Sequence, residues 1–355
     1  MPNPASNSTT VGVDRRSLLI AVAAPSAVVA ADLLTNDYNV WSDALRVDAL
    51  SFALLVALKI AFLAWAVGRG VARPVLRVVV FVWAVALVDL GVYVRYVSTS
   101  FDSASTAAIV LAQAGMLVFW SILSEIRWVW RLPIACLSIA AILPVAFHPD
   151  TGWSYDAWPL LLTVSLLGLG VACVALRWRG WRLADVAASR DRTEVVGVRR
   201  ASQFGVVHML LWSSALAPLF ALLRVNSEMM VRSLGSFGVF GSELLYVLTI
   251  STLMTLGCLV VIWVVLGGAR LWLRLLVAAV FFAAISAPLI NWSAEIWGRA
   301  RTTNWYPAWR SIDNLLHDMH EYWPCWMVLA YGSLAALLLF LRTSGQRLRR
   351  GAPAE

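Results

Sequence analysis

Long apolar blocks of about 17–24 residues recur along this chain and limit the folds that are open to it. A helix of about 20 residues crosses the roughly 30 Å hydrocarbon layer of a bilayer. Backbone groups inside lipid must bond to one another, so each block is predicted to be a helix. The residues are 61% hydrophobic and the mean hydropathy is +0.77, whereas a soluble domain is about half apolar. The sequence therefore predicts an all-α, polytopic transmembrane helical bundle.

About ten of these blocks are predicted to be spans. The first block follows Arg15 and Arg16, and it also has the pattern of a cleaved secretory signal, with Val28 and Ala30 as the small residues. We adopt the alternative, which is an uncleaved first span. The other nine spans are predicted at about 49–68, 78–95, 106–124, 132–148, 159–176, 205–223, 244–266, 271–290 and 323–341.

The basic residues are concentrated in alternate segments between the spans. Of the 28 basic residues, 20 lie on one side, seven lie on the other side and Lys59 lies within a span. The acidic residues reverse this trend, with six on the basic side and thirteen on the opposite side. Because positive charge is retained in cytoplasmic loops, both termini are predicted to be cytoplasmic, and the predicted location is the bacterial inner membrane.

A hydrophilic segment that is rich in Arg and Trp divides the spans into two groups. The predicted organisation is a disordered tail at 1–16, spans 1–6 at 17–176, a cytoplasmic loop at 177–204, spans 7–9 at 205–290, an outer loop with an amphipathic helix at 291–322, span 10 at 323–341 and a basic cytoplasmic tail at 342–355. Five spans in each half would invert the second half relative to the first, as in many transporters. We see no sequence similarity between the halves.

One stretch after the central loop resembles a segment of uncharacterised bacterial multi-pass membrane proteins. It covers 199–224 and reads R-R-A-S-Q-F-G-V-V-H-M-L-L-W-S-S-A-L-A-P-L-F-A-L-L-R. The resemblance rests on a basic pair, Gln-Phe and the run L-L-W-S-S-A, and it extends over 26 of the 355 residues. It implies a membrane protein of this kind and no particular activity.

Two opposite charges within predicted spans mark the first candidate site. Lys59 lies in the second span and Asp89 in the third, and a charge at the bilayer centre costs at least about 2.5–3.5 kcal/mol. The short connection between these spans makes them an antiparallel hairpin, in which the two residues differ in depth by about 3 Å. Gln113, near the middle of the fourth span, is placed to join them. The functional interpretation is a proton or substrate site, and the structural alternative is a pair that locks the hairpin.

A second candidate site lies in the outer loop. Asp313, His317 and His320 fall on one face of the predicted amphipathic helix. A carboxylate with two imidazoles is a ligand set for a divalent metal. The alternative is the wet face of an interfacial helix, and no specific metal motif is present. No cofactor is expected apart from a divalent metal at this position.

Arginines of the central loop form the third candidate site. They are predicted to contact anionic lipid headgroups or a protein partner, and they are Arg177, Arg179, Arg182, Arg199 and Arg200. The net charge of +8 does not indicate nucleic-acid binding, because the arginines lie in short loops between spans and not on a soluble domain.

These features favour a non-enzymatic integral membrane protein, specifically a transporter-like or small-molecule-binding bundle centred on Lys59 and Asp89. A membrane-bound enzyme acting at Asp313, His317 and His320 is the first alternative. A scaffold that docks partners through the 177–204 loop is the second. The ligand and the oligomeric state do not follow from the sequence.

Overall fold

The computed structural model describes residues 45–71, 74–96, 102–125, 128–146, 158–185, 241–268, 270–302 and 323–350, together with Ala23, Ser26 and Ala27. The helices are α2 (Leu45–Gly70), α3 (Pro74–Tyr96), α4 (Asp102–Leu123), α5 (Trp128–Ala146), α6 (Trp158–Trp178), α9 (Gly241–Leu266), α10 (Leu271–Thr302) and α13 (Trp323–Thr343). The strands are β1 (Trp181–Asp185) and β2 (Gln346–Arg350). Most of the described residues are therefore helical, as predicted.

Six of the described helices are long and apolar enough to cross a membrane: α2, α4, α6, α9, α10 and α13. They support a multi-pass integral membrane protein. The predicted third and fifth spans are covered by α3 and α5, which are 23 and 19 residues long. The predicted seventh span lies outside the described residues, as does the predicted first span apart from Ala23, Ser26 and Ala27.

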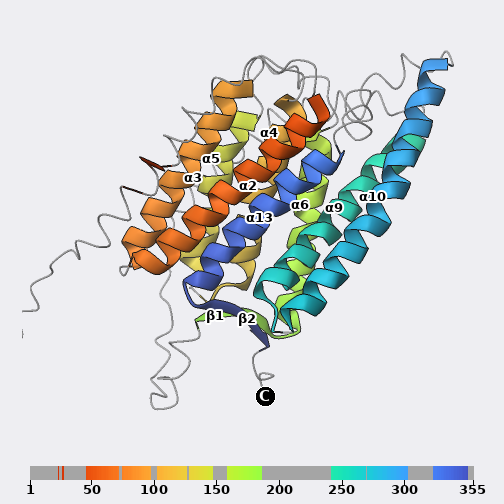
Figure 1. Ribbon diagram of the computed structural model, residues 1–355. Helices are drawn as coiled ribbons and strands as arrows, with labels where there is room; N and C mark the ends of the chain where they lie inside the picture. The colour runs from red at the N-terminus through yellow and green to blue at the C-terminus, as the bar shows by residue number, and fades with distance from the viewer. Residues whose placement is uncertain are drawn as a thin grey trace, which may run out of the picture.

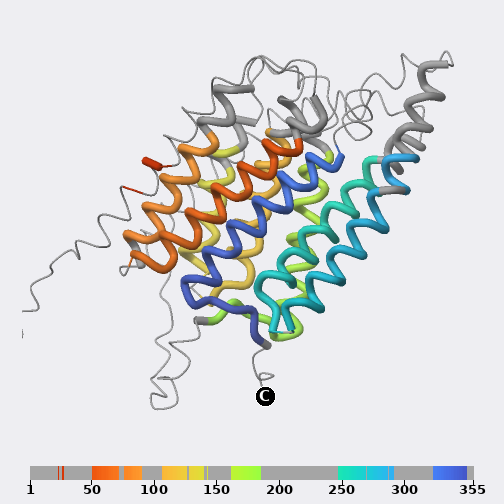
Figure 2. The backbone as a smooth tube through the Cα atoms, viewed as in Figure 1, coloured from red at the N-terminus to blue at the C-terminus, as the bar shows by residue number. Residues whose placement is uncertain are grey.

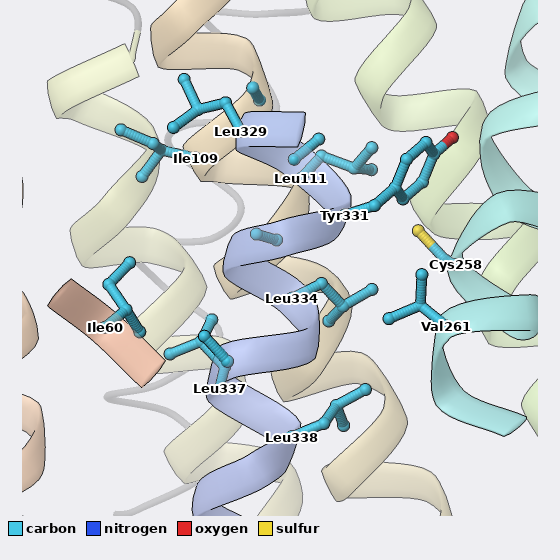
Figure 3. Close-up of a cluster of buried hydrophobic side chains, with 14 of the residues drawn as sticks. Ile60, Ile109, Leu111, Cys258, Val261, Leu329, Tyr331, Leu334, Leu337 and Leu338 are labelled. Atoms are coloured by element: carbon cyan, nitrogen blue, oxygen red, sulfur yellow. The ribbon is translucent and has the colours of Figure 1, made fainter. Parts of the chain in front are cut away.

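Helix α13, the last helix of the chain, lies inside the bundle. It packs against α2, α4, α9 and α10, and Figure 1 shows it between α2 and α9. A helix that is apolar on every side must be covered by protein or by lipid. In Figure 3, Leu334 and Leu337 of α13 lie between Ile60 of α2 and Val261 of α9. The core of the bundle is thus built around this helix.

Three helices and a strand occur twice in the fold. In the first unit, α4 packs against α5 and α6, and β1 follows α6. In the second unit, α9 packs against α10 and α13, and β2 follows α13. The units also exchange equivalent contacts, because α6 packs on α9 and α13 packs on α4. Each helix of the first unit therefore has a counterpart in the second.

The closing helices of the two units share a sequence pattern. Both α6 and α13 are 21 residues long and begin with Trp-Pro. Each runs into L-R-x-x-G-x-R-L, at 176–183 and 341–348. The glycines of the pattern, Gly180 and Gly345, have φ angles of 84° and 89°. Glycine adopts this left-handed conformation without steric cost and so turns each helix into its strand.

Strands β1 and β2 pair antiparallel across one end of the bundle, as Figure 2 shows. Leu183 lies opposite Leu348 at the centre of the register, and these leucines hold the same position in the two patterns. The register is therefore symmetric, as expected if a two-fold relation through this leucine pair connects the units. Both strands lie at one end, so α6 and α13 run in the same direction. The repeat of these units is therefore parallel, whereas the sequence predicted an inverted relation between two halves of five spans each.

Three predicted boundaries also differ from the structure. The predicted 177–204 loop contains the end of α6 and all of β1, and the predicted 342–355 tail contains β2. The described fold thus adds a small sheet to the helices. Helix α10 continues to Thr302, whereas its span was predicted to end at 290. The prediction ended where the apolar content falls, but the polar residues that follow are still compatible with a helix.

Candidate functional site

A hydrogen-bonded Asp–Gln pair connects α3 and α4 in the apolar part of the bundle. The amide Nε2 of Gln113 donates to Oδ2 of Asp89 over 2.5 Å. The second carboxylate oxygen of Asp89, Oδ1, is buried and accepts no hydrogen bond from the described residues. A buried polar atom without a partner costs about 1–3 kcal/mol. The pair therefore fixes the carboxylate and leaves one acceptor open in the interior.

Lys59 is half-buried on α2, and the packing of α2 on α13 gives its depth. A Cβ atom built at Gly332 would lie 3.0 Å from Cβ of Ala57, so these residues are at one level. Thr343 Oγ1 donates to the carbonyl oxygen of Ala64 over 3.2 Å, which shows that α2 and α13 run in the same direction. Lys59 therefore lies about 3 Å nearer the β1–β2 end than Gly332.

A ring contact between α3 and α13 gives the depth of Asp89 in the bundle. The rings of Phe81 and Phe340 stack with their centroids 4.0 Å apart. Because α3 runs away from the β1–β2 end, Asp89 lies about 12 Å farther from that end than Phe81. Gly332 lies the same distance from Phe340 along α13, so Asp89 and Gly332 are at a similar depth. Lys59 and Asp89 thus differ in depth by about 3 Å, while the ion pair between them stays a prediction.

Ser333 of α13 is a further polar residue at this depth. It is 1% exposed, and its Oγ has no hydrogen-bond partner among the described residues. Helix α13 packs against both α2 and α4, which carry Lys59 and Gln113. The sequence analysis missed Ser333, because a serine within an apolar helix commonly bonds to its own backbone. We call Lys59, Asp89, Gln113 and Ser333 the polar layer.

Arginine side chains cap helix ends at the β1–β2 end of the bundle. Arg177 of α6 donates from Nη1 to the carbonyl oxygens of Ile122 and, over 3.2 Å, of Ser124. In the second unit, Arg342 of α13 donates from Nη1 to the carbonyl oxygen of Val265 over 2.7 Å. Both arginines belong to the repeated pattern, and each connects the closing helix of its unit to the end of the opening helix.

A second pair of arginines, from α5 and α10, caps the same helix ends. Arg131, at the start of α5, donates to the carbonyl oxygen of Ser124. Arg274, near the start of α10, donates to the carbonyl oxygens of Val264 and, over 3.5 Å, of Trp263. The last carbonyls of a helix lack partners within it and form the negative end of its dipole. These arginines therefore stabilise the junctions of both units.

The arginines predicted to contact lipid or a partner occupy different positions. Arg177 binds helix carbonyls, Arg179 is exposed in the turn before β1, and Arg182 is exposed on β1. Arg199 and Arg200 lie outside the described residues. The sequence analysis missed Arg347 and Arg349, which are exposed on β2. The repeated L-R-x-x-G-x-R-L pattern was the signal that could have connected β2 with β1.

The predicted metal site at Asp313, His317 and His320 lies outside the described residues. Within the part of the chain that the structure describes, no group of three or more His, Cys, Asp or Glu residues is arranged to hold a metal ion. The four cysteines, at 136, 173, 258 and 325, are in the thiol form.

The fold and the polar layer together define a multi-pass helical membrane protein that contains a repeated unit of three helices and a strand. Comparison of the chain with protein-family models, with curated proteins and with solved structures found no match.

Proposed function

We propose that this protein is a transporter-like, small-molecule-binding membrane protein whose ligand site is the polar layer. In this proposal the chain crosses the bacterial inner membrane about ten times, with both termini in the cytoplasm. The predicted cytoplasmic side carries 20 of the 28 basic residues. The last residues of α2, α6 and α13 all lie on the side of the bundle that carries the β1–β2 sheet. The proposed ten-span topology requires this.

The main support for this proposal is Oδ1 of Asp89, which is buried and accepts no hydrogen bond from the described residues. Ionisable residues within a membrane are costly and are usually retained for a function. Gln113 orients one oxygen of Asp89 and leaves Oδ1 without a partner among the described residues. That oxygen is available to a proton, a cation or a hydrogen-bond donor of a small ligand.

The parallel repeat supports the same proposal. Several transporter folds consist of parallel repeats related by an axis along the membrane normal, with the ligand site near the midplane. In this protein the repeated units run in the same direction. The polar layer lies roughly halfway along α13, beside the contact of α13 with α4.

Cysteine accessibility tests whether water reaches the polar layer. The four native cysteines are replaced with alanine, and Gln113→Cys is compared with Leu111→Cys, a fully buried neighbour on α4. A charged, water-soluble methanethiosulfonate should modify the cysteine at 113 and spare the one at 111. In the same background, cysteines at Ser311 and Ser189 report the orientation, and only the former should react from outside intact cells.

Equal protection of both α4 cysteines, on either side of the membrane, would contradict a ligand site. The polar layer would then be a sealed structural contact. Reaction at 189 and not at 311 from outside the cell would overturn the proposed orientation without bearing on the site.

A further inference from the structure

The face of the β1–β2 sheet that points away from the bundle carries a compact group of arginines. Residues directly opposite in an antiparallel pair point to one face, and successive residues alternate between faces. Leu183 is 3% exposed and Leu348 packs against the core, so this pair faces the bundle. Arg182, Arg347 and Arg349 therefore lie on the other face, where all three are exposed. We call these three residues the arginine plate.

The register brings these charges close together. Arg182 lies directly opposite Arg349, and Arg347 lies opposite Ala184. Opposite Cβ atoms in a sheet are about 4.5–5.5 Å apart, and diagonal neighbours about 7–8 Å.

Like charges placed directly opposite each other destabilise a sheet. The outward face nevertheless holds three cations and one alanine. An anion bound across the plate would interact with all three cations. The guanidinium group suits a phosphate in particular, because its planar fork donates two parallel hydrogen bonds.

The sheet lies at the depth of lipid headgroups. Two residues connect each strand to its helix, Arg179–Gly180 on one side and Ser344–Gly345 on the other. Two extended residues span at most about 7 Å. The headgroup region on each side of the hydrocarbon is about 5–8 Å thick. The plate therefore lies within or just beyond the headgroups of the membrane that holds α6 and α13.

Exposed tryptophans mark the membrane interface at the same end of the bundle. Trp178 is 87% exposed at the end of α6, and Trp272 is 61% exposed at the start of α10. Trp128 is also exposed, at the start of α5. Tryptophan is enriched where the headgroups meet the hydrocarbon. This belt independently places the end of the bundle at a lipid surface.

We propose that the arginine plate is a binding site for the phosphate-bearing headgroup of an anionic phospholipid. Its position near the membrane, its spacing and its charge fit a headgroup better than a soluble anion. The proposal rests on the membrane embedding stated under the proposed function, but not on the polar layer. A sealed polar layer would therefore leave this inference unaffected.

Native mass spectrometry of the purified full chain in detergent tests the proposal. Dioleoyl phosphatidylglycerol is titrated against dioleoyl phosphatidylcholine, which has the same acyl chains and no net charge. The plate variant is Arg182→Gln/Arg347→Gln/Arg349→Gln. The matched control is Arg69→Gln/Arg179→Gln/Arg270→Gln, which removes the same charge from exposed arginines at the same end but off the plate.

We expect the wild type to prefer phosphatidylglycerol at least about tenfold. A basic residue near an anionic surface contributes about 1 kcal/mol, which is about fivefold in affinity. The plate variant should therefore lose about a hundredfold in affinity, and the control should lose much less. Replacement of the three plate arginines with lysine keeps the charge and the fold but removes the planar guanidinium group. We therefore expect several-fold weaker binding of phosphatidylglycerol.

Three results would overturn the proposal. The first is wild-type binding without preference for phosphatidylglycerol. The second is an equal loss in the plate variant and the control, which would indicate diffuse attraction by the whole basic end. The third is displacement of the lipid by inorganic phosphate at an equal concentration, which would identify a soluble anion as the ligand.

Discussion

The α6–α9 and α4–α13 contacts are equivalent in the repeat, yet they are made by different side chains. Where α9 meets α6, Ser251 Oγ donates to the carbonyl oxygen of Leu161 over 3.2 Å, and Thr255 Oγ1 donates to that of Ser165 over 3.0 Å. Where α4 meets α13, the residues equivalent to Ser251, Thr255 and Ser165 are alanines that are at most 1% exposed: Ala108, Ala112 and Ala330. The first contact thus has hydroxyl hydrogen bonds at positions where the second has only alanine methyl groups.

The equivalence of these positions rests on backbone contacts. The carbonyls of Trp120 and Trp263 each accept the N–H four residues later, over 3.0 and 2.9 Å. Two residues after each tryptophan, the carbonyls of Ile122 and Val265 accept the pattern arginine. When Trp120 is aligned with Trp263, each residue of α4 has a counterpart on α9. The Trp-Pro dipeptides at the starts of α6 and α13 align these two helices in the same way.

Small side chains, and not particular hydrogen bonds, therefore set this helix geometry. A Cβ built at Gly168 would lie 2.8 Å from Thr255 Oγ1, so the α6 backbone comes very close to α9. Alanines permit a similar approach between α4 and α13. Interhelical hydrogen bonds in membranes contribute on average about 0.6 kcal/mol each. Close packing alone is therefore enough to maintain the second contact.

The two units differ in sequence at the polar layer. Gln113 of α4 binds Asp89 of α3, whereas its counterpart on α9 is Leu256, which is 42% exposed. Lys59 and Asp89 come from α2 and α3, outside the repeated units. The candidate site is thus asymmetric, and it forms where the α2–α3 hairpin meets α4 of the first unit and α13 of the second.

Loss of a helix-capping arginine should have the largest effect and should be equal in the two units. Arg177→Met and Arg342→Met each remove charged hydrogen bonds to terminal carbonyls, and such bonds contribute about 1.5–3 kcal/mol. We expect both variants to unfold at clearly lower temperatures in detergent, as followed by tryptophan fluorescence, and Arg179→Met to match the wild type. Strongly unequal losses would show that the two junctions are not equivalent.

A glycine-to-alanine substitution should affect thermal stability differently in the two units. A Cβ at Gly257 would lie 2.4 Å from the hydroxyl of Tyr331, and overpacking of this kind costs about 1–3 kcal/mol. At the corresponding α4–α6 contact, a Cβ at Gly170 would lie 3.8 Å from Val118. We expect Gly257→Ala to lower the thermal midpoint and Gly170→Ala to leave it unchanged or raise it. Tolerance of alanine at 257 would refute the tight α9–α13 packing.

Removal of an interhelical hydroxyl should have the smallest effect. Thr255→Val deletes the bond to the α6 carbonyl while keeping the side-chain shape, so a loss of about 0.6 kcal/mol is expected. Thr252→Val is the control, because the Thr252 hydroxyl is exposed and bonds to Leu248 of its own helix. A loss of several kcal/mol at 255 alone, in the same unfolding assay, would contradict packing as the main determinant.

The candidate site was only partly readable from the sequence. Lys59, Asp89 and Gln113 stand out because charged and amide side chains are rare within apolar blocks. Ser333 does not stand out, since serine is common in such blocks, and only the position of α13 places it in the layer. Likewise, Arg347 and Arg349 read as part of a basic tail until β2 pairs with β1.

The sequence by itself determined that this chain forms membrane-length helices, because the transfer of an apolar block into lipid depends on its own residues. It did not determine which helices pack together. Lipid chains are as apolar as leucine, so helix association depends on shape and close approach, not on hydrophobicity. Only the tertiary structure decided that α13 occupies the centre. The same holds for the pairing of Leu183 with Leu348, which are far apart in the chain. That pairing requires two helices to end side by side, and no local property of either strand specifies it.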